Sequence, residues 1–168
     1  MVVIGLGSPF LSDDSIGPRV VRRLGEQGLS GVRLVEAHAG GLLLLEELQG
    51  VQRAVIIDAL LDERKTVGEI YLASLDGTTR NASCGHDCSL PETLAIGRAL
   101  GMELPEDRNI HLVAIVARDV ATFSEQLTPA VEAALDDACD LVWRLLEPIQ
   151  GEGSRCHDFV LHKDTIAL

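Results

Sequence analysis

Two short, fully apolar segments constrain the fold of this chain more than any other feature. Val2–Leu6 and Ala54–Ile57 each have the length of one strand and contain no polar residue, which is typical of a parallel sheet covered on both faces. Between them the sequence predicts three elements: a helix with the apolar stripe Ile16, Val20, Val21 and Leu24, a strand at Val32–Val35, and a second helix at Leu42–Leu48. This β-α-β-α-β order predicts an open α/β sheet with right-handed crossovers.

The segment after Ala54–Ile57 breaks this alternation, and Asp58 is expected to end the strand. A fourth strand is predicted at Glu69–Ala73, and the polar loop before it is too short to hold a crossover helix. Short links of this kind join antiparallel neighbours. The predicted fold class is therefore α/β: a single domain with an open, twisted, mostly parallel sheet of about five strands, one antiparallel edge strand, and helices on both faces.

The second half of the chain supplies the remaining elements. Ser89–Glu92 has the spacing of a capping box, which predicts a helix that stops at Gly101. Ile110–Val116 predicts the fifth strand. Thr128, followed by a proline, predicts the N-cap of one long helix that Pro148 ends. Because periodicity fades after that point, residues 1–150 are expected to form the domain and residues 151–168 a C-terminal tail.

Charge and composition exclude several classes of function. The chain has 14 Lys and Arg against 26 Asp and Glu, a net charge of −12, which repels phosphate backbones and anionic lipids. Aromatic residues make up only 3%, so few side chains could stack on bases. The four scattered cysteines, and an N-terminus without a signal-peptide pattern, indicate no secreted disulfide framework. We expect a cytoplasmic monomer that binds neither nucleic acid nor membranes.

The glycine-rich turn after the first strand is the first candidate site. Gly5 and Gly7 lie between a strand and a helix, as in a dinucleotide-binding loop, but Phe10 stands where that fingerprint needs a third glycine. Asp13 and Asp14 are predicted at the helix N-terminus, where they would repel a phosphate. Complementing the helix dipole would explain one acid there, but not two adjacent acids in a glycine-rich turn.

Two further side chains could act with Asp14. Ligands of open α/β folds bind beyond the carboxyl ends of the strands, so Asp14 and Asp58 are expected to face one crevice; alternatively, Asp58 only caps the turn after it. His86 lies between Cys84 and Cys88, in a long polar loop that would have to return it to the crevice. This segment could be a Cys/His metal cluster, a loop in which only His86 matters, or a solvated connection.

The remaining histidines and nucleophiles give weaker signals. His38 follows the second strand, near the expected crevice, and could be a bystander or a supporting group, whereas His111 lies in an apolar strand and is expected in the core. The chain contains no Gly-x-Ser-x-Gly elbow. A cysteine peptidase would need Cys84 or Cys88 paired with a histidine, and His86 is too close along the chain for that.

Four segments resemble the hydrogenase maturation endopeptidases: Ile4–Gly17, Val55–Ala59, His86 and Leu127–Val131, in that order. The resemblance extends from Met1 to about Pro148. It implies an open twisted sheet flanked by helices, and an enzyme that removes the C-terminal extension of a [NiFe]-hydrogenase large-subunit precursor after nickel insertion. Carried over residue by residue, the metal-contacting acid, acid and histidine of the family fall on Asp14, Asp58 and His86.

The resemblance implies that these three side chains are both metal and catalytic residues. Two carboxylates and one imidazole leave coordination positions open on a divalent ion such as nickel. The nickel would arrive with the precursor and be bound transiently, as a recognition element and not as a permanent cofactor. Ser8 and the turn at Glu36–Gly40 depart from the family pattern, which leaves the type of partner hydrogenase open. A non-catalytic nickel-binding accessory protein and a phosphate- or dinucleotide-binding α/β enzyme are the alternatives.

Overall fold

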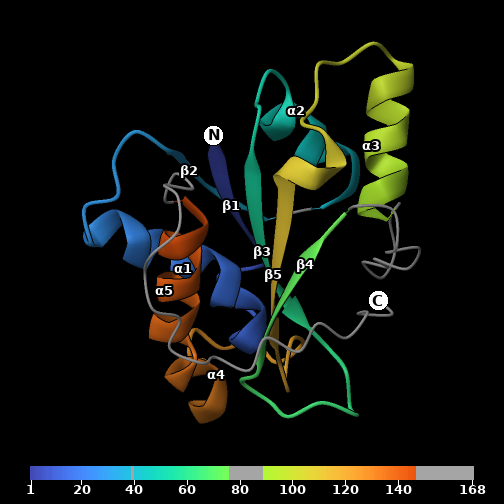
Figure 1. Ribbon diagram of the computed structural model, residues 1–168. Coiled ribbons are helices and arrows are strands. Elements are labelled where there is room, and N and C mark those ends of the chain that lie inside the picture. The colour runs from blue at the N-terminus through green and yellow to red at the C-terminus, as the bar shows by residue number, and fades with distance from the viewer. Residues whose placement is uncertain (39, 76–88, 147–168) are drawn as a thin grey trace.

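A five-stranded sheet forms the centre of the protein, which a computed structural model describes at residues 1–38, 40–75 and 89–146 (Figure 1). The strand order is β2-β1-β3-β5-β4. The bounds are Val2–Leu6 for β1, Arg33–Ala37 for β2, Ala54–Leu60 for β3, Ile70–Ser74 for β4 and Ile110–Val116 for β5. All neighbours are parallel except β4, which pairs antiparallel with β5 at one edge. The predicted fold class is confirmed.

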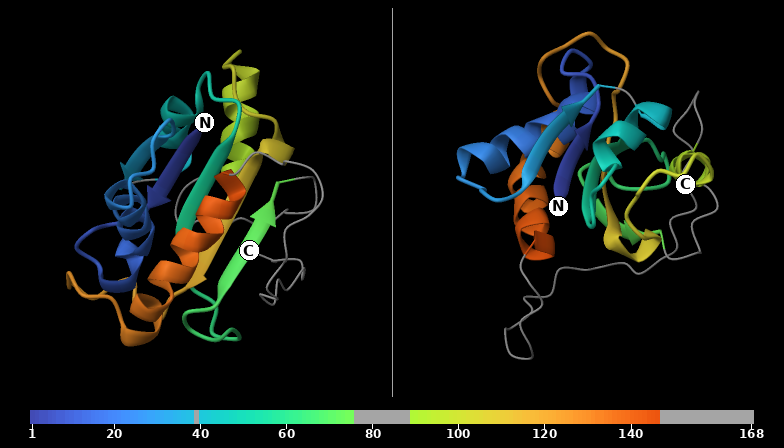
Figure 2. Two further views of the ribbon diagram at one scale, coloured as in Figure 1. Left: turned by 60° about the vertical axis from the view of Figure 1, so that its left-hand side comes forward. Right: turned by 90° about the horizontal axis from the view of Figure 1, so that it is seen from above.

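Helices cover both faces of the sheet, because successive residues of a buried strand point to opposite sides and both sides here are apolar (Figure 2). One face carries α1 (Ile16–Glu26), α4 (Pro129–Ala133) and α5 (Leu135–Leu146), and the other carries α2 (Leu44–Leu48) and α3 (Leu90–Ala99). Three short 3-10 turns complete the order, at Ser12–Ser15 (η1), Gly41–Leu43 (η2) and Asp107–Asn109 (η3). The core is therefore split into two layers by the sheet.

Two predicted elements differ from the structure. The strand β3 continues to Leu60 and does not end at Asp58, because β5 pairs with it along its whole length, whereas its pairing with β1 stops at Ile57. The single long helix predicted after Thr128 is divided into α4 and α5 at Ala134. The N–H of Ala134 bonds to a carbonyl only three residues back, which is the tighter 3-10 spacing and interrupts the α-helical ladder.

The capping box of α3 is present as predicted. The N–H of Ser89 donates to Glu92 Oε2 at 2.9 Å, and the N–H of Glu92 donates to Ser89 Oγ at 3.4 Å. The predicted end of the last helix at Pro148 and the predicted tail at residues 151–168 lie outside the described residues. Among the residues described, no helix combines the length and the apolar character that a bilayer crossing requires.

Candidate functional site

Close backbone contact fixes the start of α1 against the carboxyl ends of β1 and β3. A Cβ atom added at Gly17 would lie 2.3 Å from the carbonyl oxygen of Leu6 and 2.7 Å from that of Ile57. One added at Gly5 would lie 2.2 Å from the carbonyl oxygen of Gly17. Only glycine fits contacts this short. The turn η1, which directly precedes α1, is therefore held at the same edge of the sheet as the residues that follow Ile57.

Asp14 lies in this turn and is half-buried, and its side chain links the two sides of the turn. Its Oδ2 accepts a hydrogen bond of 2.6 Å from the N–H of Ser8. Gly7 has φ +129°, and a Cβ there would lie 1.8 Å from the carbonyl oxygen of Asp14, so the two sides of the turn are in backbone contact. In a dinucleotide site, loop N–H groups of this kind bind phosphate. Here a carboxylate already occupies one of them, which disfavours the nucleotide-binding alternative.

Asp58 lies in β3 at the point where the neighbouring strands diverge. Ile57 is the last residue of β3 that pairs with β1, while Asp58 still pairs with Ala114 of β5. The Asp58 side chain is half-buried, and its Oδ1 accepts a hydrogen bond of 2.8 Å from the N–H of Ala59. The parallel order of β1 and β3 thus places Asp14 and Asp58 at one edge of the sheet; their chemical role stays a prediction.

Asp13 has a role that sequence reasoning missed. Its carboxylate is fully buried and accepts four hydrogen bonds. The donors are the N–H groups of Arg118 and Asp119, at 3.0 and 3.1 Å, and the N–H and hydroxyl of Thr128, at 2.6 and 3.0 Å. This explains why two acids stand side by side: Asp13 fastens the turn internally, and Asp14 remains at its surface. Because the Thr128 hydroxyl bonds to Asp13, it makes no capping bond to α4.

The loop after β5 braces the turn that carries Asp14. Leu11 and Ser124 form a parallel bridge. The N–H of Ser12 donates to the carbonyl oxygen of Ser124 at 2.8 Å, and the N–H of Ser124 donates to the carbonyl oxygen of Phe10 at 2.9 Å. Ser12 is held at φ +37°, a conformation that non-glycine residues adopt only when their surroundings enforce it. The two loops are more than 100 positions apart in the sequence, so no local sequence signal reveals this contact.

The third predicted ligand, His86, lies outside the described residues, together with Cys84 and Cys88. Within residues 1–38, 40–75 and 89–146, no group of three or more His, Cys, Asp or Glu side chains is placed to hold a metal ion. Two of the three predicted ligands, Asp14 and Asp58, are among the described residues. Completing a three-ligand site would require a side chain from elsewhere in the chain, which is the role predicted for His86.

The two described histidines have different surroundings. Exposed His38 lies at the candidate site, with Nδ1 3.3 Å from the carbonyl oxygen of Gly7. His111 is half-buried in β5 rather than in the core. Burial, and then the positive charge of Arg53, lower the pKa of His111 below its ordinary value. His111 pairs with Val55 near the opposite end of the sheet from Asp58, so it takes no part in this site.

Comparisons with known proteins give one consistent result. The model of the family described as hydrogenase maturation protease matches residues 18–145, which include Asp58 and begin just after Asp14. The hydrogenase 2 maturation protease of Escherichia coli (strain K12) is 24% identical over 147 residues, covering 84% of this chain and 87% of the relative.

Solved structures agree with this match. The hydrogenase maturating endopeptidase HybD from Escherichia coli superposes with a TM-score of 0.72 at 26% identity, covering 86% of this chain and 90% of its own. The [NiFe] hydrogenase maturation protease HybD from Thermococcus kodakarensis shares the fold, with a TM-score of 0.63 at 22% identity and coverage of 87% and 98%. Since the family model spans well over half of the chain, this protein belongs to the hydrogenase maturation protease family.

Proposed function

We propose that this protein is an endopeptidase that removes the C-terminal extension of a [NiFe]-hydrogenase large-subunit precursor once nickel has been inserted. Asp14, Asp58 and His86 bind that nickel transiently and so recognise a loaded precursor. The observation that carries the proposal is the joint placement of Asp14 and Asp58 at the carboxyl edge of the sheet. Membership of a protease family supports the hydrolytic part.

The surroundings of Asp14 suit a ligand to an incoming ion. Its Oδ2 is held by the N–H of Ser8, and within the described part of the chain no hydrogen bond reaches Oδ1. The carboxylate is thus oriented before the substrate arrives, while one oxygen stays available. Such preorganisation lowers the cost of binding. A carboxylate pair with one imidazole suits a divalent transition metal and leaves positions for the ligands of the precursor itself.

The nickel in this proposal belongs to the substrate. A bound divalent ion can polarise a carbonyl group or lower the pKa of a water molecule. Asp14, Asp58 and His86 orient the precursor at the sheet edge and, by binding its nickel, distinguish a loaded precursor from a nickel-free one. We also propose a cytoplasmic location for the protein, because its four scattered cysteines do not have the pattern of a secreted disulfide framework.

The test compares two forms of one precursor. Purified large-subunit precursor, nickel-loaded or nickel-free, is incubated with the full-length protein, and the intact mass of the precursor is followed by mass spectrometry. The proposal predicts loss of a C-terminal peptide from the loaded form alone. Binding of the loaded form without any loss of mass would instead support the non-catalytic accessory protein. Equal cleavage of both forms would contradict nickel recognition and leave the peptidase activity standing.

A further inference from the structure

The backbone is strained at Ser12, two residues before Asp14. Ser12 has φ +37°, and within the described part of the chain it is the one residue other than glycine with a positive φ. It is also buried, with 4% of its surface exposed. A serine stays in this conformation only where its surroundings hold it there, and strain of this kind is concentrated at functional sites. The bonds that hold Ser12 therefore bear on the position of Asp14.

The peptide group between Ser12 and Asp13 is fixed at both ends. Its carbonyl oxygen, which belongs to Ser12, accepts a hydrogen bond of 2.7 Å from the hydroxyl of Ser15. Its N–H, which belongs to Asp13, donates to the carbonyl oxygen of Asp119 at 2.8 Å. The hydroxyl of Ser12 also donates to the carbonyl oxygen of Gln126, at 3.2 Å. The peptide group can therefore rotate only if the bonds at both of its ends break.

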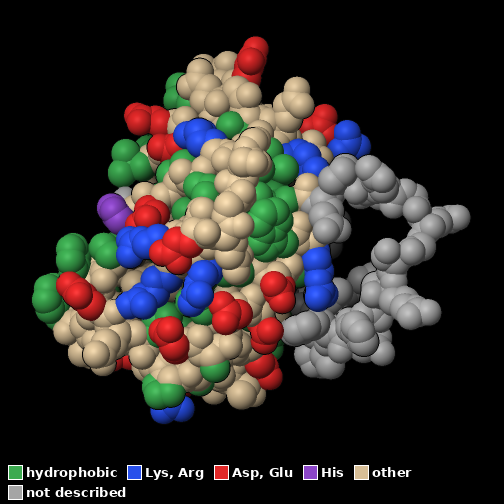
Figure 3. All heavy atoms as spheres, turned by 90° about the vertical axis from the view of Figure 1, so that its left-hand side faces the viewer, with side chains coloured by type: hydrophobic (Ala, Val, Ile, Leu, Met, Phe, Trp, Pro, Cys, Tyr) green, Lys and Arg blue, Asp and Glu red, His purple; other side chains and the backbone are tan. Residues whose placement is uncertain are grey.

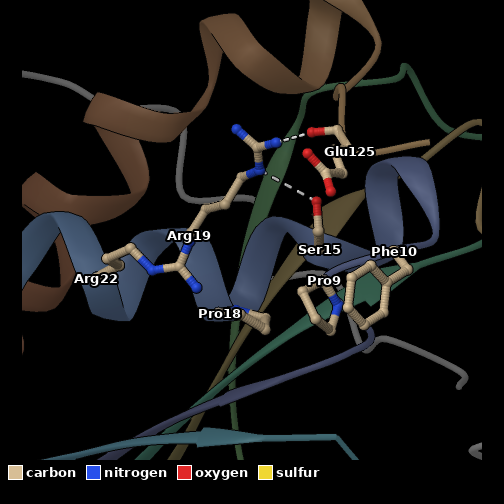
Figure 4. Close-up of a pocket in the computed structure, with 7 residues that line it drawn as sticks. All are labelled: Pro9, Phe10, Ser15, Pro18, Arg19, Arg22 and Glu125. Atoms are coloured by element: carbon tan, nitrogen blue, oxygen red, sulfur yellow. Dashed lines mark hydrogen bonds between the residues drawn. The ribbon is translucent and has the colours of Figure 1, made fainter.

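Arg19 of α1 orients the hydroxyl of Ser15 (Figure 4). Its Nε donates to Ser15 Oγ at 3.2 Å, and its Nη2 donates to the carbonyl oxygen of Glu125. A guanidinium can only donate, and a hydroxyl has a single hydrogen. Ser15 Oγ therefore accepts from Arg19, which leaves its one hydrogen for the carbonyl oxygen of Ser12. Because Ser15 is only 1% exposed, little water competes for this hydroxyl.

The charge of Arg19 is balanced within the protein. Its Nη1 lies 4.0 Å from Oε2 of Glu132, an ion pair to α4. One turn further along α1, Arg23 pairs with Asp136 at 3.8 Å, and basic and acidic side chains are interspersed over this face of the molecule (Figure 3). This balance suits an arginine that supports the turn better than one that binds an external anion.

Asp14 lies between the two serines that are joined in this way. Its N–H donates to the carbonyl oxygen of Leu11 at 2.9 Å, and its Oδ2 accepts from the N–H of Ser8 at 2.6 Å. Rotation of the peptide group after Ser12 would move the backbone of Asp14 and draw its carboxylate away from Ser8. The position of this carboxylate thus depends on side chains that do not touch it.

We propose that Ser15 and Arg19 are positioning residues for Asp14. Arg19 orients the hydroxyl of Ser15, which holds the peptide group after Ser12. That peptide group in turn sets the carboxylate of Asp14 at the sheet edge. The inference rests on the proposed function, in which this carboxylate binds the nickel of the precursor. It gives a role to two residues that bind no metal and take no part in the chemistry.

The amide proton of Ser8 reports the position of Asp14 directly, because its short bond to a charged oxygen shifts its NMR resonance downfield. The test compares full-length wild-type protein with Ser15→Ala and Arg19→Met, and Asp14→Ala, which removes the acceptor, gives the full upfield displacement. Both variants are expected to move the Ser8 resonance towards its position in Asp14→Ala. A variant that is merely less stable would leave this resonance unmoved, since the native state still dominates the sample.

Cleavage of nickel-loaded precursor relates this position to function. Ser15→Ala and Arg19→Met are each expected to lower kcat/KM about tenfold, the effect of about one lost hydrogen bond, while circular dichroism shows an intact fold. Arg23→Met is the matched control, because Arg23 lies on the same helix and its partner Asp136 is outside the turn. It should keep the Ser8 resonance of the wild type and a kcat/KM within about twofold.

The outcomes separate the support of Asp14 from the proposed activity. A Ser8 resonance that stays at its wild-type position in both Ser15→Ala and Arg19→Met would overturn the positioning role, whatever the cleavage result. A displaced resonance together with cleavage at the wild-type rate would overturn it as well. A displaced resonance in these variants, together with wild-type protein that never cleaves the loaded precursor, would support the positioning of Asp14 and contradict the peptidase.

Discussion

The carboxylate of Asp13 accepts hydrogen bonds from both the N–H and the hydroxyl of Thr128, 115 positions further along the chain. Asp13 is fully buried, and its neighbour Asp14 is half-buried at the sheet edge. Asp13 therefore secures the turn to the loop before α4, whereas Asp14 lies at the candidate site. Removing the Asp13 side chain should also disturb the position of Asp14.

Asp13→Ala is expected to lower the free energy of unfolding by about 3 kcal/mol, because buried N–H groups lose a charged acceptor. Thr128→Val removes only the hydroxyl donor and should cost about 1–2 kcal/mol. Urea unfolding followed by circular dichroism measures both. The exposed Asp140→Ala serves as the control and should stay within about 0.5 kcal/mol of the wild type. An Asp13→Ala variant as stable as this control would contradict the fastening role.

Gly17→Ala is expected to destabilise the protein by about 2 kcal/mol or more, because the new Cβ would overlap the carbonyl oxygens of Leu6 and Ile57. Processing activity should fall as well, since α1 and the preceding turn must move away from β3. Gly25→Ala, in the same helix, is the matched control: its Cβ would meet only Leu34 Cδ1, at 3.5 Å. That variant should be neutral or more stable by up to about 1 kcal/mol. Equal stabilities for the two variants would refute the close-contact argument.

Local patterns were sufficient to predict most of the fold. Apolar runs, helical spacing and the capping box at Ser89 identify elements over a few residues, and chain connectivity then fixes the parallel order and the edge strand β4. The end of β3 was misplaced because Asp58 breaks the apolar run while its backbone still pairs with β5. Backbone pairing does not depend on side-chain polarity, so the apolar run alone gave too short a strand.

The site was predictable only in part, for a related reason. Asp14 follows β1, and Asp58 lies in β3 just beyond the last residue that pairs with β1, so the parallel order of the two strands places both acids at one edge. The fastening of Asp13 depends on Thr128 and on backbone N–H groups of a distant loop, and no pattern near Asp13 contains that information. The hydroxyl of Thr128 was predicted to cap its own helix, but the buried carboxylate is the stronger, charged acceptor.

Cys139 predicts a dependence of stability on alkaline pH. Burial, and then the negative charge of Asp136, raise the pKa of its thiol from the ordinary 9.0 to about 11. The folded state therefore holds the proton that the unfolded state releases above about pH 9. The resulting contribution to the free energy of unfolding is fully present below pH 9. It is lost as the pH rises towards 11, so the free energy of unfolding falls by about 2–3 kcal/mol in total.

Guanidinium unfolding at a series of pH values between 8 and 11 measures this loss. Cys139→Ala has no thiol to titrate, so its stability should decline less over the same interval. The comparison uses the slope of stability against pH rather than its absolute value, because the smaller side chain also leaves a cavity. Parallel slopes for the two proteins would show that the thiol does not couple to folding.

Asp58→Asn and His86→Ala are each expected to abolish processing while circular dichroism shows an intact fold, because each removes a ligand for the nickel of the precursor. The combined Cys84→Ser, Cys88→Ser variant alters the segment around His86 without touching it and should process the precursor at nearly the wild-type rate. Loss of activity in this cysteine variant would instead favour a Cys/His cluster in that segment.

The most direct test of the account is the intact mass of nickel-loaded precursor after incubation with Asp14→Asn protein. The substitution keeps the size of the side chain and an oxygen that can accept from the N–H of Ser8, but it removes the charge that would bind nickel. Wild-type protein is expected to shorten the precursor, and Asp14→Asn protein is expected to leave it at full length. Shortening at the wild-type rate by Asp14→Asn protein would contradict the role proposed for Asp14.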